Sequence, residues 1–241
     1  MIVLEGALSI KAALKYHRRK IDVVYLDETK KPSKDLLYIE NLCHKESVLF
    51  KRISLDEIQK HTQGKTHGGL IAFAQDRNLS TLESVIKKEK GFILLVEGIE
   101  DPFNLGQIFR TAAIAGVDAI LMGCRQLETS QSTLMKSSAG LFDAIDLIMA
   151  DDLTKCILTL RQHNYTFAVT YRNESSIDYL NFDFKQNVIL GIGGEMRGLS
   201  SSVMEQMDHA VMITYPTDLK VALNAVSATA VLCFEVARQR R

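Results

Sequence analysis

The pattern of apolar and polar positions changes along the chain near residue 77. Before that point, short segments alternate between the helical period and the strand period. The expected helices cover 6–19, 34–46 and 54–62, and the expected strands cover 21–27, 48–53 and 68–75. Residues 77–90 are polar at both ends, and Ser80 and Glu83 have the S-x-x-E spacing of a capping box. We therefore expect a small α/β domain over 1–76 and a linker helix over 77–90.

From residue 91 onward, apolar strands alternate with helical segments. The expected strands are 92–98, 118–123, 141–149, 166–171, 187–193 and 209–215, and the expected helices are 104–116, 130–138, 151–163 and 199–207. Such alternation predicts an α/β domain with a mostly parallel sheet and helices on both faces. The segment 219–241 is apolar all round, so we expect it in the core or in a subunit interface.

Composition narrows the function classes. The chain has 241 residues, of which 46% are apolar and 24% charged, as in soluble globular proteins, and it has no apolar run long enough for a membrane span. The start has no pattern of a signal peptide. Four scattered cysteines without a C-x-x-C pair argue against a zinc site or a disulfide framework, and they fit a reducing cytoplasm. The formal net charge is zero, so any nucleic-acid surface must be local.

The stretch "DPFNLGQIFRTAAIAG" (101–116) follows a buried strand and opens a helix. It has neither the glycines of a dinucleotide turn nor G-K-[ST], and carries Asn104, Gly106 and Arg110 instead. If the helix starts near Asn104, both polar side chains are expected near the carboxyl edge of the sheet, where ligands bind. An arginine there suits a phosphate or a carboxylate. The alternative is a capping asparagine and a surface arginine.

Two further stretches carry polar residues at similar places. "GIGGEMRGLS" (191–200) follows a strand, and its glycines indicate a backbone that something approaches closely, with Glu195 as a hydrogen-bond acceptor. The alternative is a glycine-rich turn. Asn224 stands at an apolar helix start, where a plain N-cap is the alternative to a ligand contact. Ser227 and Thr229 are expected to bond back to the helix backbone.

Together, in this order and at these spacings, the three stretches resemble the SpoU (TrmH-like) family of RNA 2′-O-ribose methyltransferases, of the SPOUT class. The resemblance covers 91–241. The first family motif matches Asn104, Gly106 and Arg110, the second matches Gly193, Glu195, Gly198 and Leu199, and the third matches Leu223 and Asn224. "LEGALSIKAAL" and "THGGLIA" are similar to the small ribosomal-protein-like substrate-binding domain that precedes the catalytic domain in many members.

The resemblance implies a C-terminal trefoil knot, S-adenosylmethionine as cofactor and a homodimer with the site at the subunit interface. It implies catalytic roles for Asn104, Arg110, Glu195 and Asn224. It implies that Gly193, Gly194, Ile213 and Leu223 hold the cofactor. No metal is needed, because a sulfonium is already an activated methyl donor. The family's third motif usually has two serines, which are Ala222 and Val226 here.

The resemblance also implies an RNA substrate and a cytoplasmic enzyme, and the extra N-terminal domain favours ribosomal over transfer RNA. RNA contacts are expected from Lys15, Arg18 and Arg19 in a basic segment and from His67. The lost serines motivate one alternative, a catalytically weak or inactive RNA-binding or ribosome-assembly protein. A second alternative is an unrelated nucleotide-binding α/β enzyme, which the missing dinucleotide fingerprint argues against.

Overall fold

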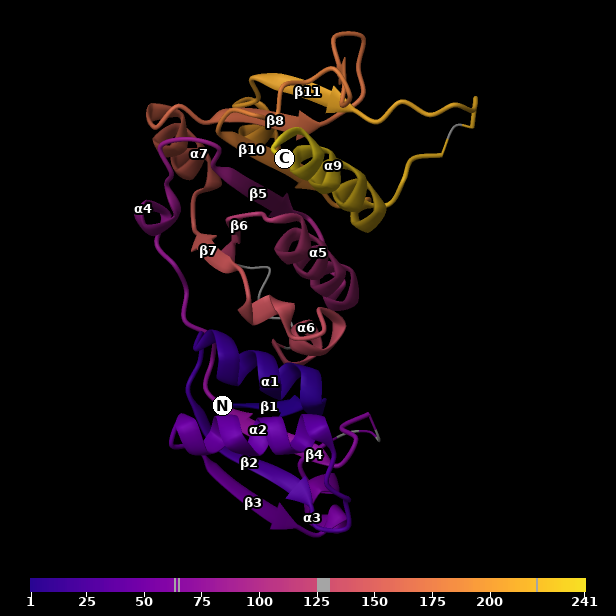
Figure 1. Ribbon diagram of the computed structural model, residues 1–241. Helices are drawn as coiled ribbons and strands as arrows, with labels where there is room; N and C mark the ends of the chain where they lie inside the picture. The colour runs from indigo at the N-terminus through magenta and orange to yellow at the C-terminus, as the bar shows by residue number, and fades with distance from the viewer. Residues whose placement is uncertain (63, 65, 125–130, 220) are drawn as a thin grey trace. The chain divides into compact units, whose positions relative to one another are not determined.

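The computed structural model describes residues 1–62, 64, 66–124, 131–219 and 221–241. The chain divides into two compact units, drawn in Figure 1. The N-terminal unit comprises Met1–Asn78 together with Thr129–Ala144, and the C-terminal unit comprises Leu79–Glu128 and Ile145–Arg241. Within the described residues no helix is long and apolar enough to cross a membrane.

The N-terminal unit is built on a four-stranded sheet of order β1-β4-β2-β3. β4 pairs antiparallel with β1 and with β2, whereas β2 and β3 are parallel. Its elements are β1 (Ile2–Glu5), α1 (Gly6–Tyr16), β2 (Ile21–Asp27), α2 (Lys34–Lys45), β3 (Leu49–Ile53), α3 (Leu55–Gln59), β4 (Leu70–Ala74), α6 (Gln131–Ser137) and the 3₁₀ helix η2 (Leu141–Asp143). The expected helices and strands of this region are present, and β1 is an additional strand.

Two serines fix helix starts in this unit. The Ser33 hydroxyl accepts from the backbone N–H of Leu36 at 3.3 Å, and the Ser54 hydroxyl accepts from that of Glu57 at 3.3 Å. Each serine satisfies a backbone donor that the first turn of a helix leaves unpaired. Ser54 and Glu57 also have the S-x-x-E spacing of a capping box, and the bond of Ser54 confirms the cap that this spacing predicts.

Residues 131–144 pack with the N-terminal residues through a buried ion pair. Arg19 donates from Nε to Asp143 Oδ2 at 2.7 Å and from Nη2 to Oδ1 at 2.8 Å, and both side chains are fully buried. The Arg77 guanidinium lies 4.8 Å from the centre of the Phe142 ring. Gly140 has a φ of +86°, and a Cβ there would come within 2.7 Å of the Leu8 carbonyl. Glycine is therefore required at this contact.

The sequence predicts a strand over 141–149, and the structure confirms only its second half. Strand β7 begins only at Asp146, and the residues before it form η2. The physical reason is Asp143: its carboxylate needs a charged partner when buried, and Arg19 supplies one from 124 positions earlier in the chain. Hydrophobic periodicity carries no information on such a long-range pair.

The C-terminal unit is a seven-stranded sheet of order β7-β6-β5-β10-β8-β11-β9 in which every pair is parallel. Its strands are β5 (Phe92–Glu97), β6 (Ala119–Gly123), β7 (Asp146–Ala150), β8 (Thr166–Thr170), β9 (Ile177–Asp178), β10 (Val188–Gly193) and β11 (His209–Met212). Its helices are α4 (Leu82–Val85), α5 (Pro102–Ala115), α7 (Leu153–Gln162), α8 (Ser201–Met204) and α9 (Ala225–Gln239). The predicted parallel α/β fold is confirmed.

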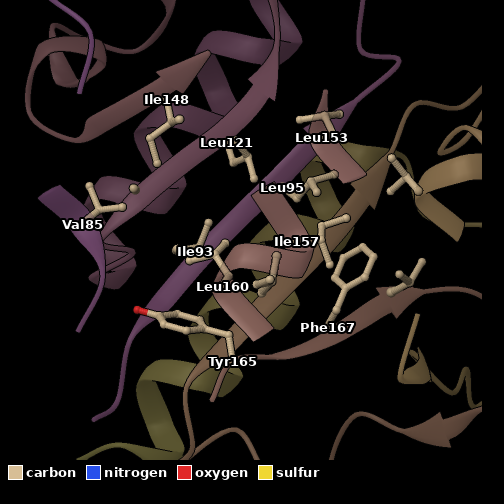
Figure 2. Close-up of a cluster of buried hydrophobic side chains, with 14 residues drawn as sticks. Val85, Ile93, Leu95, Leu121, Ile148, Leu153, Ile157, Leu160, Tyr165 and Phe167 are labelled. Carbon is tan, nitrogen blue, oxygen red and sulfur yellow. The ribbon is translucent and has the colours of Figure 1, made fainter. Parts of the chain in front are cut away.

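A continuous apolar core holds this sheet. Figure 2 shows part of it, where Ile93 and Leu95 of β5 meet Ile157 and Leu160 of α7 beside Phe167 of β8. All but one of the β5 side chains are buried, which explains why the strand is apolar without alternation. α5 and α9 lie side by side (Figure 1).

Two helices are shorter than the sequence predicts. The linker over 77–90 contains a single helical turn, α4, and its N-cap is Thr81, whose hydroxyl accepts from the Ser84 N–H at 3.3 Å, rather than Ser80. The Ser80 hydroxyl is bonded to Asp146 instead. α8 covers Ser201–Met204, whereas the sequence predicts a helix over 199–207. α9 begins at Ala225 directly after its N-cap Asn224, which is the helix start that the sequence indicates. The described residues of the segment before α9 run without helix or strand, and Figure 1 shows them reaching out beyond β11 before α9 begins.

Candidate active site

The first motif lies at the start of α5. The Asp101 carboxylate caps this helix by accepting from the backbone N–H groups of Phe103 at 3.2 Å and Asn104 at 3.1 Å, and Pro102 follows it at the first helical position. The helix therefore starts two residues before Asn104, which lies in the first turn with an exposed side chain. The capping role considered for Asn104 belongs to Asp101.

Arg110 lies further along the same helix and is exposed. Six positions along a helix rotate by about 240° beyond a full turn, so Asn104 and Arg110 point about 120° apart and lie about 9 Å apart along the axis. The sequence analysis expects both side chains near the edge of the sheet. In the structure they point in different directions instead. Among the described residues Arg110 has no hydrogen-bond or ion-pair partner. Its guanidinium is available to a ligand or to another chain.

The exposed face of α5 combines this arginine with apolar side chains. Phe103, Gln107, Arg110 and Ile114 follow at intervals of four, three and four residues, which places them on one face. Phe103 and Ile114 are each 60% exposed. On the neighbouring α9, Phe234 is 46% exposed. Large apolar side chains on two adjacent helices mark a surface that another protein surface can cover.

The second motif forms a tight backbone contact. A Cβ on Gly194 would lie 1.8 Å from the carbonyl oxygen of Gly98, at the end of the neighbouring strand β5. A Cβ on Gly193 would lie 2.7 Å from the carbonyl carbon of Gly198. The sequence correctly predicted a close approach, but the group that approaches is the chain's own backbone. These glycines let the ends of β5 and β10 pack together and leave Glu195 exposed beyond them.

Glu97 is a neighbour of the second motif that the sequence pattern did not single out. It ends β5, and its carboxylate accepts from the backbone N–H of Ser200 at 2.7 Å. This bond joins the end of β5 to the turn that leads into α8. The sequence could have pointed to Glu97, because it is a polar residue at the end of an otherwise apolar strand.

The third motif supplies a helix cap and a loop. The Asn224 side-chain oxygen accepts from the backbone N–H of Ser227 at 2.8 Å, so Asn224 is the N-cap of α9. The Thr229 hydroxyl donates to the carbonyl of Ala225 at 2.7 Å, which confirms the expected back-bonding. The backbone N–H of Leu223 donates to the Tyr215 hydroxyl at 2.9 Å. Tyr215 thus provides a hydroxyl in a loop that lacks the serines usual in the family.

A cavity of about 840 Å³ opens at the carboxyl ends of β8, β10 and β11. Most of the residues expected to hold a cofactor or to act beside it line this cavity: Gly193, Glu195, Ile213, Leu223 and Asn224. Gly194, Asn104 and Arg110 do not line it. The structure therefore brings the second and third motifs together and leaves the first motif outside their cavity within one subunit.

The predicted RNA contacts divide into exposed and buried side chains. Lys15 is exposed and Arg18 is half-buried. Arg19 is 4% exposed and fully engaged, because it also donates to Gln75 O at 3.2 Å and to Gln131 Oε1 at 3.1 Å. His67 is 3% exposed, and its Nδ1 accepts from the Gly69 N–H at 3.0 Å. Burial leaves these last two side chains no face for an RNA phosphate, so we withdraw them from the RNA surface.

The cysteines are free thiols. Burial raises the pKa of Cys233, inside α9, to about 12, and burial raises that of Cys43 to about 11. Both therefore stay protonated and pack as small apolar groups at neutral pH.

Two family models match the chain. The model of the SpoU rRNA Methylase family matches residues 91–234, and the model of RNA 2′-O ribose methyltransferase substrate binding matches residues 3–79. The chain belongs to the SpoU rRNA methylase family. Membership confirms the predicted enzyme class, an RNA 2′-O-ribose methyltransferase.

Individual relatives and solved structures support the assignment to the SpoU family. The 23S rRNA (guanosine-2′-O-)-methyltransferase RlmB of Xanthomonas campestris is 30% identical over 85% of this chain and 84% of its own. A TrmH family tRNA/rRNA methyltransferase of Staphylococcus aureus is 30% identical over 72% of this chain and 71% of its own. The SpoU methyltransferase AviRb from Streptomyces viridochromogenes, solved in complex with the cofactor AdoMet, is 19% identical, with a TM-score of 0.82 over 99% of this chain and 90% of that one.

Proposed function

We propose that the chain methylates one ribose 2′-hydroxyl of ribosomal RNA, and that 23S rRNA is its substrate. The single observation that carries this proposal is the cavity that joins the second and third SpoU motifs in a chain whose N-terminal unit matches the substrate-binding family model. The similarity to RlmB over both units supports 23S rRNA. The action on ribosomal RNA in turn supports the cytoplasm as its location.

The residues that line the cavity suit the cofactor. A volume of about 840 Å³ is within the usual range for small-molecule sites. Gly193, Ile213 and Leu223 offer backbone groups for the adenosyl part, and charged side chains lie at the rim. When bound, S-adenosylmethionine supplies an activated methyl group. We include the trefoil knot in this proposal, since the fold resembles that of AviRb over nearly the whole chain.

The protein's own task is to orient and deprotonate the ribose hydroxyl. A guanidinium does not give up its proton at neutral pH, so Arg110 grips a phosphate or the hydroxyl oxygen. The Glu195 carboxylate is exposed beside the cavity and accepts the proton, directly or through the RNA phosphate. Asn224 keeps its side-chain amide N–H groups for a ligand, because its oxygen is used by the cap. Asn104 orients the RNA from the first turn of α5.

A homodimer completes this site. Arg110 lies outside the cavity of its own subunit, on the α5 face that also carries Phe103 and Ile114. Covering this face and Phe234 with a second copy buries the apolar side chains and brings Arg110 of one subunit toward the cavity of the other. Sedimentation velocity tests this: Phe234→Glu is expected to give monomers. A dimer of unchanged stability in this variant and in Ile114→Glu contradicts the proposal.

Mapping of ribose methylation in total RNA tests the substrate. Deleting the gene is expected to remove one 2′-O-methyl group from 23S rRNA, and the wild-type gene is expected to restore it. The inactive assembly-protein alternative predicts unchanged ribose methylation and no binding of S-adenosylmethionine by calorimetry. The first outcome supports catalysis, and the second rejects it.

A further inference from the structure

The cofactor cavity contains an arginine that none of the three motifs includes. Arg172 lies two residues after the last residue of β8 and lines the cavity together with Ile213 and Tyr215. The other charged side chains among the described residues of the lining are Glu195 and Asp218, both acidic. Among the lining residues that the structure describes, Arg172 is thus the one cation, and the other charged groups are carboxylates.

The guanidinium of Arg172 is held against the segment that leaves β11. Its Cζ atom lies 5.0 Å from the centre of the Tyr215 ring, and Nη2 donates to the carbonyl of Ile213 at 3.5 Å. A guanidinium stacked on an aromatic ring is attracted by the ring's negative face and loses conformational freedom. Arg172 makes no further hydrogen bond or ion pair to any described residue, so N–H groups of its fork remain available.

Tyr215 is fixed in turn by the third motif. Its hydroxyl accepts from the backbone N–H of Leu223 at 2.9 Å, so the ring joins the residues that follow β11 to those that precede α9. Arg172, Tyr215 and Leu223 therefore form a connected series from the end of β8 to the cofactor-binding loop. A group bound to the guanidinium would be held in a defined position relative to that loop.

We propose that Arg172 binds the carboxylate of the methionine part of S-adenosylmethionine and that Tyr215 positions the guanidinium for it. The inference rests on the proposed cofactor cavity. A carboxylate is the group that a planar guanidinium fork recognises best, and it is the one anionic group of this cofactor. The two acidic side chains of the lining repel a carboxylate, which leaves the Arg172 side of the cavity as its place.

Calorimetric titration of the full-length chain tests this with two ligands that differ in one group. S-adenosylmethionine has the carboxylate, and decarboxylated S-adenosylmethionine lacks it. Arg172→Ala is expected to raise the Kd for S-adenosylmethionine by about 10- to 100-fold, the usual range for a charge-assisted hydrogen bond. The same variant is expected to leave the Kd for the decarboxylated ligand within about twofold.

Three further variants refine the result. Arg52→Ala, an exposed arginine in the other unit, removes the same charge and should bind both ligands as the wild type does. Arg172→Lys should recover only part of the lost affinity, since an ammonium lacks the fork. Tyr215→Phe keeps the ring but releases Leu223, so it should weaken both ligands alike.

Two outcomes overturn the proposal. One is an Arg172→Ala variant that binds S-adenosylmethionine as the wild type does, with or without a loss of RNA affinity. The other is an equal loss for both ligands. Either result leaves the cofactor cavity itself in place, whereas a wild-type chain that binds neither ligand contradicts the proposed function as well.

Discussion

Buried charges gather in the N-terminal unit, whereas the C-terminal unit keeps most of its charged groups at the edge of an apolar sheet. Arg19, Asp27, Arg77 and Asp143 are all less than 7% exposed. In the C-terminal unit the residues with expected chemistry, Arg110 and Glu195, are exposed, and the core around β5 is apolar. A polar residue amid apolar neighbours can thus be structural or functional, and exposure separates the two cases.

The pair Arg19 and Asp143 provides the largest expected effect on stability. Breaking a buried pair leaves one charge without a partner, so Arg19→Met or Asp143→Leu alone should lower the free energy of unfolding by about 3–5 kcal/mol. The double variant should lie close to the wild type, because two apolar groups then fill the site. Urea unfolding measures all three variants.

A matched control comes from an exposed pair. Lys60 and Glu57 contact each other at 2.6 Å on the surface, and Lys60→Ala should barely move the unfolding midpoint. If Arg19→Met unfolds at the wild-type urea concentration, residues 131–144 are not held by this pair.

In contrast to Arg19, Arg110 should affect catalysis and not stability. Arg110→Ala should reduce single-turnover methyl transfer by about 10²- to 10³-fold, the usual cost of one group that stabilises developing charge, while stability and cofactor Kd stay near the wild type. Arg110→Lys should fail almost as badly, since an ammonium does not reproduce the planar fork. Near-normal transfer in Arg110→Ala would return this residue to an ordinary surface position.

The contact between Gly194 and Gly98 predicts an intermediate effect. A methyl group at Gly194 meets a carbonyl oxygen at 1.8 Å, so the ends of β5 and β10 must separate. Gly194→Ala should cost about 1–3 kcal/mol of stability, as overpacked cores do, and it should weaken the cofactor site beside it. Gly123→Ala is the control, since its Cβ meets nothing within 4 Å. Equal thermal midpoints for the two variants would contradict the close contact.

The central strands of the parallel sheet could be predicted from the sequence for a physical reason. Buried parallel strands are continuous apolar runs, and "FILLVEG" and "NVILGIG" indicate β5 and β10 on local grounds alone. The role of Arg19 depends on Asp143, a partner far away in the sequence, so a basic run was the only local signal. The two-residue strand β9 and the four-residue strand β1 are too short for periodicity to detect.

The sequence predicted which residues form the candidate site, but it predicted their relative positions only in part. The motif residues Gly193, Glu195, Leu223 and Asn224 do meet around one cavity. Asn104 and Arg110 do not converge, because both lie inside α5, where six residues separate them by about 120° around the axis and about 9 Å along it. Arg172 belongs to no motif, and it reaches the cavity only because β8 lies between β10 and β11 in the sheet.

The smallest expected effect concerns RNA binding, in which the exposed Lys15 can be compared with the buried Arg19. Each phosphate contact contributes about 0.7–0.9 to the slope of log affinity against log salt. Lys15 is exposed at the end of α1, so Lys15→Ala should flatten this slope by up to about one unit. The Arg19→Met/Asp143→Leu double variant should leave the slope unchanged, because its guanidinium never reached solvent. Filter binding of a 23S rRNA fragment over a salt series measures both slopes. A flattened slope in the double variant would mean that Arg19 leaves Asp143 to meet the RNA, and an unchanged slope in Lys15→Ala would move the RNA surface away from α1.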